Sequence, residues 1–317
     1  MANEIKIGIS SCLLGEKVRF DGGHKHDRFI SESLGQYFSW VPICPEVESG
    51  LGTPRPTLRL ERSAGEVRLI QPATKLDLTE KMNRYCQKKL KFIAAQNLCG
   101  YIVKSKSPSC GKGGIKVYVG HAIKPDGGGV GLFAKALTEA FPSLPVEDEG
   151  RLCDPNLREN WVNRVFALHA FRSQMHPRPT LGKLVSFHSS YKFIILSHCH
   201  ETYRQMGQLV ANGKSTPIAD LIQQYEALLM TAMKKRATPA KHVNVLLHLF
   251  GFFKTKLDAG VRAQILEIIE DYRRGIVPLI VPITLVRHYA RMLNIDYLEN
   301  QSYLSPHPKE LALRNQI

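Results

Sequence analysis

The sequence predicts an α/β domain with a mostly parallel sheet, followed by an all-α domain. Short apolar or β-branched runs in the first half end in small polar residues, as strands of a parallel sheet do. The second half shows almost only helical periodicity. Because the pattern changes after Asp154-Pro155, we place the two domains at residues 1–154 and 155–317. A chain of 317 residues is long enough for both.

Strands and helices alternate along the predicted first domain. Apolar and alternating runs predict strands at 5–9, 40–44, 101–103, 115–119 and 144–146, and a hairpin of 57–62 with 67–70 around Ala64-Gly65. Helical spacing predicts helices at 28–38, 78–97 and 130–141. This order favours a Rossmann-like sheet, in which sites lie at the carboxyl ends of the strands. The glycines at 127–129 and 131 precede a helix, and such a turn can hold a phosphate.

The predicted second domain consists of helices. Their expected ranges are 157–172, 181–211, 218–236, 242–257, 262–274 and 283–293. The Pro177-Arg178-Pro179 segment separates the first two, and the prolines within 277–282 separate the last two.

The composition is that of an ordinary globular protein, with 44% apolar and 22% charged residues. No run of about 18 apolar residues and no long apolar signal region are present, so we expect a cytoplasmic protein without a membrane partner. Seven cysteines, an odd number, argue against a disulfide framework. Nothing in the sequence implies an obligate protein partner.

Positive charge is concentrated in the second half. Residues 1–154 carry 22 Lys and Arg against 17 Asp and Glu, whereas residues 155–317 carry 21 against 11. An excess of this size favours a polyanionic partner, most commonly a nucleic acid. The alternative is a merely basic protein. The candidate phosphate contacts, which could equally be helix-end cations, are Lys234, Lys235, Arg236, Arg273 and Arg274.

Three loops at predicted strand ends each contain one cysteine. Cys12 lies in SSCLLG, Cys44 precedes PEVESGLGTPRPT, and Cys110 lies in KSKSPSCGKGG. Three interpretations remain open: unrelated buried thiols, a zinc site, or an iron–sulfur cluster with three cysteine ligands. The spacing matches no zinc-finger or ferredoxin pattern, but the shared strand-end position favours one site. Cys86 and Cys99 lie among apolar positions and are expected in the core.

These motifs carry a family resemblance. SSCLLG with the following RFDGG, CPEV with GLGTPRP, and KSPSCG resemble the thiouracil desulfidase (TudS) family over about residues 4–150. The helical remainder resembles the YbgA-type domain of unknown function that is often fused to it. Such fused chains, called RudS, are associated with removing sulfur from 4-thiouridine in tRNA.

The resemblance implies a site and a reaction. Cys12, Cys44 and Cys110 would hold a 4Fe–4S cluster whose open iron binds the substrate sulfur, and water would replace that sulfur at carbon 4 without redox chemistry. Glu46 would act as the general base, and Ser107 would hydrogen-bond it or relay a proton.

Four further residues are candidate substrate contacts: Arg55, Lys104, Asp21 and Ser109. Of these, Arg55 could instead hold its loop, and Asp21 could serve only in a turn. The expected function is desulfuration of 4-thiouridine in tRNA. One alternative is a desulfidase of free thiouracil or thionucleosides. The other is a non-enzymatic nucleic-acid-binding protein with a structural metal site.

Overall fold

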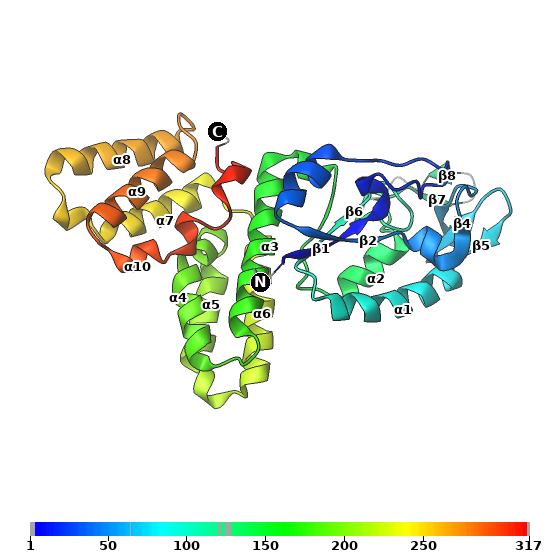
Figure 1. The fold of residues 1–317 in the computed structure, drawn as a ribbon, viewed down its shortest axis with the longest axis horizontal. Helices are drawn as coiled ribbons and strands as arrows, with labels where there is room; N and C mark the ends of the chain where they lie inside the picture. Colours follow the sequence, from blue (N-terminus) through cyan, green and yellow to red (C-terminus); the bar gives the residue numbers. More distant parts are fainter. Residues whose placement is uncertain (1–3, 64, 120–121, 124–127, 316–317) are drawn as a thin grey trace. The chain divides into compact units, whose positions relative to one another are not determined.

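The computed structural model describes residues 4–63, 65–119, 122–123 and 128–315. The chain forms two compact units, residues 1–154 and 155–317, called here the N-terminal unit and the helical unit (Figure 1). Among the described residues, no helix is long and apolar enough to cross a membrane.

Four parallel strands form the main sheet of the N-terminal unit, in the order β2-β1-β6-β9. Their bounds are Lys6–Ser10 (β1), Ser39–Ile43 (β2), Gly100–Val103 (β6) and Val146–Asp148 (β9). The predicted parallel sheet is therefore confirmed. β9 begins later than predicted. The Leu144 N–H donates to the Phe141 carbonyl at 3.0 Å, so Leu144 belongs to a turn and not to the sheet.

Two α-helices pack side by side in this unit: α1 (Thr79–Gln96) and α2 (Leu132–Ala140) (Figure 1). The predicted helix at 78–97 is confirmed. The apolar side of α1 packs in one core with the sheet and α2. Members of this core include Ile43, Met82, Cys86, Ile93, Tyr101, Val103, Phe133 and Leu137. Cys86 and Cys99 are both 3% exposed, as expected for core thiols.

A second sheet, not predicted as separate from the first, has the order β5-β4-β3-β7-β8. Its strands are Arg59–Ser63 (β3), Glu66–Gln71 (β4), Leu76–Asp77 (β5), Val117–Val119 (β7) and Ala122–Ile123 (β8). The predicted β3–β4 hairpin is confirmed, although Ala64 lies outside the described residues. β5 and β8 have two residues each, too few to produce a recognisable alternation.

Two segments differ from their predicted form. Residues 28–38 are a π-helical turn, Phe29–Ser33, followed by a 3₁₀ turn, Leu34–Gln36, rather than an α-helix. The loop after β2, where no helix is predicted, contains a π-helical segment, Val47–Leu51 (η4), in which Gly50 adopts a φ of 81°.

The start of α2 packs directly on the Cys110 loop. A side chain at Gly131 would place its Cβ 2.5 Å from the Ser109 carbonyl oxygen, so only glycine allows this approach. The Phe133 and Ala134 N–H groups donate to that same carbonyl at 3.0 and 3.2 Å. The helix N-terminus therefore holds the cysteine loop rather than a free phosphate site; Gly127 lies outside the described residues.

The helical unit contains eight α-helices in its described residues (Figure 1). They are Pro155–Met175 (α3), Leu181–His198 (α4), His200–Ala211 (α5), Ile218–Lys234 (α6), Pro239–Gly251 (α7), Ala259–Arg273 (α8), Ile280–Met292 (α9) and Asp296–Glu299 (α10). The all-α prediction is confirmed. Their apolar faces form a core within residues 167–304, separate from the core of the N-terminal unit.

Several predicted boundaries in this unit are wrong; the helix predicted at 242–257, for example, spans Pro239–Gly251, and two other differences have a clear local cause. The single helix at 181–211 is broken at Cys199, whose backbone is extended and whose Sγ accepts a hydrogen bond from the Thr202 N–H at 3.5 Å, capping α5. The apolar periodicity continues through the break, so the pattern could not reveal it. Pro282 lies inside the first turn of α9, where a missing N–H is tolerated, so the helix begins earlier than predicted.

Candidate active site at the strand ends

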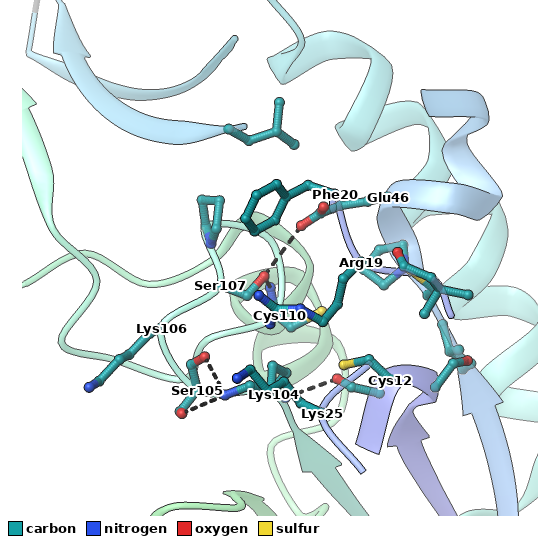
Figure 2. A pocket seen from close by; sticks show the side chains of 18 of the residues that line it. Cys12, Arg19, Phe20, Lys25, Glu46, Lys104, Ser105, Lys106, Ser107 and Cys110 are labelled. Atoms are coloured by element: carbon teal, nitrogen blue, oxygen red, sulfur yellow. Dashed lines mark hydrogen bonds between the residues drawn. The ribbon is translucent and has the colours of Figure 1, made fainter. Parts of the chain in front are cut away.

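A cavity of about 370 Å³ opens at the carboxyl ends of β1, β2 and β6 (Figure 2). Cys12, Cys44 and Cys110 all line it, together with Glu46 and Ser107. Its size is within the range of small-molecule sites. The structure thus brings all three strand-end cysteines to one cavity.

The order of the sheet explains why these loops meet. Cys12 lies in the 3₁₀ turn Ser11–Leu14 directly after β1, and Cys44 directly follows β2. Cys110 lies in the turn that follows β6, and its N–H donates to the Ser107 hydroxyl at 3.1 Å. Because β1 is paired with β2 on one side and β6 on the other, their carboxyl ends are adjacent.

The three thiols are buried enough to stay protonated in the protein alone. Burial raises the pKa of Cys12 to about 11, and it also raises the pKa of Cys44 and, well above its usual value, that of Cys110. After burial, the neighbouring Cys44 thiol raises the pKa of Cys12 further. Glu46, and then Cys44, do the same for the pKa of Cys110. The sulfurs therefore lie within electrostatic reach of one another. Protonated thiols are weak nucleophiles, whereas metal coordination removes the proton.

Glu46 is held from both sides at the edge of this cavity. Its Oε2 accepts from the Arg55 Nε at 2.9 Å, and its Oε1 accepts from the Ser107 hydroxyl at 3.3 Å (Figure 2). The same hydroxyl oxygen accepts from the N–H groups of Ser109 and Cys110, at 3.2 and 3.1 Å. Ser107 therefore both shapes the Cys110 turn and connects that turn to the carboxylate.

Arg55 and Lys104 line the cavity, but both already form hydrogen bonds with other residues of the chain. The Arg55 side chain is 4% exposed, and besides Glu46 it donates to the carbonyls of Val18 and Gly52 at 3.0 and 2.8 Å. These contacts are those of a residue that holds the loop. Lys104 donates from its Nζ to the Ser105 carbonyl at 3.0 Å and to the Glu149 carboxylate.

The other two candidate substrate contacts lie away from the cavity surface. Asp21 is exposed in a turn, where its Oδ1 accepts from the Gly23 N–H at 3.0 Å and pairs with Arg19 at 3.4 Å. Ser109 is fully buried behind the Cys110 turn. Neither is among the described residues that line the cavity.

Two carboxylates that support the site were not predicted. Glu149 accepts from the Ser105 N–H at 2.7 Å, and Glu48 accepts from the Cys44 N–H at 3.0 Å. Glu149 directly follows β9, so the strand-end rule that selected the cysteines could also have found it. Glu48 lies within a π-helical segment, which no pattern in the sequence indicates.

Comparisons with known proteins now decide the family. A family model described as 2-thiouracil desulfurase matches residues 7–149, and a model for a protein of unknown function, DUF1722, matches residues 192–308. The uncharacterized protein YbgA of Escherichia coli is 33% identical over 153 residues, which is 48% of this chain and 90% of YbgA. The chain belongs to the 2-thiouracil desulfurase family. It joins that family's domain to a DUF1722 domain, as the motifs predicted.

Two further similarities concern shorter parts of the chain. The uncharacterized protein YbbK of Bacillus subtilis is 33% identical over 112 residues, 34% of this chain and 74% of YbbK. A solved structure of the [4Fe-4S]-dependent thiouracil desulfidase TudS is 31% identical, with a TM-score of 0.39, over 47% of this chain and 94% of TudS.

Proposed function

We propose that the N-terminal unit removes sulfur from a thiopyrimidine with a [4Fe–4S] cluster held by Cys12, Cys44 and Cys110, and that its substrate is 4-thiouridine in tRNA. The observation that carries the proposal is the convergence of three thiols from neighbouring strand ends on one cavity beside the Glu46–Ser107 pair. Family membership supports the reaction class, and the basic helical unit supports the RNA.

The donor set fits a cluster better than a single ion. Among the described residues, no group of three His, Cys, Asp or Glu side chains is arranged to hold one metal ion. A cluster is larger than an ion, so its thiolate ligands stand farther apart around one cavity.

The surrounding residues suit a hydrolytic replacement of sulfur by oxygen. When bound, the cluster would supply an open iron as a Lewis acid for the thione sulfur. Glu46, oriented by Arg55 and Ser107, would take a proton from the water that attacks the ring carbon. Water adds oxygen to that carbon, the carbon–sulfur bond breaks, and the sulfur leaves as hydrosulfide. No electron transfer is needed for this balance.

The test of the base is a pair of substitutions at Glu46. Glu46→Gln keeps an oxygen for Arg55 but cannot take a proton, so we expect turnover to fall by about 10²-fold or more with full iron content. Glu46→Ala should lose as much activity, and some stability as well, because Arg55 is left buried and unpaired. Ser107→Ala should lose less. Glu66→Ala, which removes an exposed paired carboxylate, is the control. Wild-type turnover in Glu46→Gln would remove Glu46 from the mechanism.

The RNA substrate is tested by salt-dependent binding. Lys234, Lys235 and Arg236 are exposed at the end of α6, and replacing all three by alanine should weaken tRNA binding. The slope of log affinity against log salt should flatten by about 0.7–0.9 for each phosphate that is no longer neutralised. The control removes three exposed cations of α1: Arg84, Lys88 and Lys91. An unchanged slope in the α6 variant, measured by filter binding, would contradict this role.

The rival substrates are free thiouracil and thionucleosides, which need no basic surface. Nucleoside analysis of tRNA before and after incubation with anaerobically reconstituted protein decides between them. Loss of 4-thiouridine with a matching gain of uridine supports the tRNA substrate. Turnover of free thiouracil without any change in tRNA favours the rival, and no turnover of either favours a non-enzymatic nucleic-acid-binding protein.

A further inference from the structure

The helical unit contains a cavity of its own, of about 520 Å³. It is lined by the first turns of α3, the end of α4, the α6–α7 connection, the α8–α9 connection and the segment at 313–314. Three of the basic residues selected from the sequence line its wall: Arg236, which follows α6, and Arg273 and Arg274 at the end of α8. The cavity therefore gives these cations a common position that the sequence did not indicate.

The wall of this cavity carries an excess of positive charge. Arg273 and Arg274 share one carboxylate, Glu270, at 2.7 and 2.9 Å, and both remain more than half exposed. Arg314 is buried against Glu159 at 3.2 Å, and Arg236 adds a further exposed cation. The positive end of α7 contributes as well, because its N-cap Thr238 and the following Pro239 line the cavity.

Besides the Arg314–Glu159 pair, the interior carries polar groups without charge. His198 lies 2.6 Å from the Lys235 carbonyl through its Nδ1, and His242 lies 2.8 Å from the Tyr303 hydroxyl. Burial lowers the pKa of His198 to about 4 and that of His242 well below its usual value, so both rings are neutral at physiological pH. Tyr272 adds an aromatic ring in edge-to-face contact with His242, with centroids 6.3 Å apart.

One buried amide oxygen lacks a partner there. Asn163 lines the cavity and is 7% exposed, and its Oδ1 has no hydrogen-bond partner in the described part of the chain. Its Nδ2 lies 3.5 Å from Glu159. Buried polar atoms are nearly always hydrogen-bonded, so an unpartnered amide oxygen in a cavity wall indicates a ligand that donates to it. Asparagine and glutamine amides are common partners of base edges.

We propose that this cavity binds one nucleotide, with its phosphate on the Arg236, Arg273 and Arg274 wall and its base against Asn163 and the aromatic interior. The planar guanidinium group matches phosphate oxygens in pairs, and base–aromatic stacking tolerates any sequence. The volume lies within the ~300–1,000 Å³ of small-molecule sites and is larger than a phosphate alone requires. This proposal rests on the proposed tRNA substrate, because the bound nucleotide would be an unstacked residue of that tRNA.

The experiment measures equilibrium binding to the full chain, independently of desulfuration. The probes are uridine 5′-monophosphate, uridine, inorganic phosphate, and a tRNA transcript without 4-thiouridine. We expect the monophosphate to bind more tightly than phosphate or uridine, and to compete with the transcript. Monophosphate binding without competition would overturn the RNA source of the nucleotide, and failure of all four probes to bind would overturn the site.

Two variants separate the phosphate wall from the interior. Arg236→Ala should weaken binding of the monophosphate and the transcript about tenfold, the scale of removing one charge-assisted hydrogen bond, and flatten the salt slope. Asn163→Ala should weaken both without changing the salt slope, and circular dichroism checks that it is folded. Arg262→Ala, an exposed arginine of α8 that does not line the cavity, is the matched control. Equal binding by the Arg236 and Arg262 variants would overturn the site, while desulfuration, measured separately, would still test the proposed function.

Discussion

Replacing any one of Cys12, Cys44 and Cys110 by alanine is expected to abolish stable cluster binding and turnover together. Each thiol comes from a different strand end, and all three line one cavity, so no neighbouring cysteine can replace a missing ligand. Two thiolates leave a second iron open and bind the cluster too weakly to survive purification. Iron and sulfide content per chain, together with visible absorbance after anaerobic reconstitution, measures the loss directly.

The remaining four cysteines provide the controls. Cys86 and Cys99 are buried in the core, so their alanine variants are expected to lose packing without losing iron. Cys153 is exposed, and Cys199 caps a helix in the other unit. Full iron content and turnover in Cys110→Ala would refute the ligand set, whereas loss of iron in Cys86→Ala would show that iron content follows stability rather than ligation.

The main sheet and its site could be predicted because both depend on local patterns. A β-branched run such as 5–9, ending at once in Ser10-Ser11-Cys12, contains the strand and the strand-end residue in one stretch of chain. A parallel sheet then brings such ends together whatever the spacing between them. The Cys12, Cys44 and Cys110 loops therefore meet, although their spacing in the sequence matches no zinc-finger or ferredoxin pattern.

The features that could not be predicted depend on tertiary packing. The sequence leaves Arg55 as either a substrate contact or a support of its loop, and only the folded loop brings Glu46 and two loop carbonyls to its guanidinium. Arg236 follows α6 and Arg273 ends α8, so their common cavity follows from the tertiary fold of the helical unit. The break at Cys199 is set by a cap within a continuous apolar pattern, and periodicity cannot detect it.

The N-terminal unit alone is expected to retain action on a free thiopyrimidine and to lose most of its action on tRNA. Its apolar core and its cavity use only residues of 1–154, and the core of the helical unit uses only residues of 155–317. Separate cores allow each unit to fold by itself. Two-thirds of the net positive charge, +10 of +15, belongs to residues 155–317.

The comparison uses both substrates with both the full chain and residues 1–154, each reconstituted to the same iron content. A small neutral base gains nothing from a cationic surface on the helical unit, so its turnover should be similar in the two proteins. A tRNA must be held while its base is unstacked into the cavity, and that binding energy is lost with the helical unit. The deficit on tRNA should be largest near physiological salt and shrink at low salt, where weak phosphate contacts suffice. Equal turnover of tRNA by the two proteins at every salt concentration would show that the helical unit has a different task.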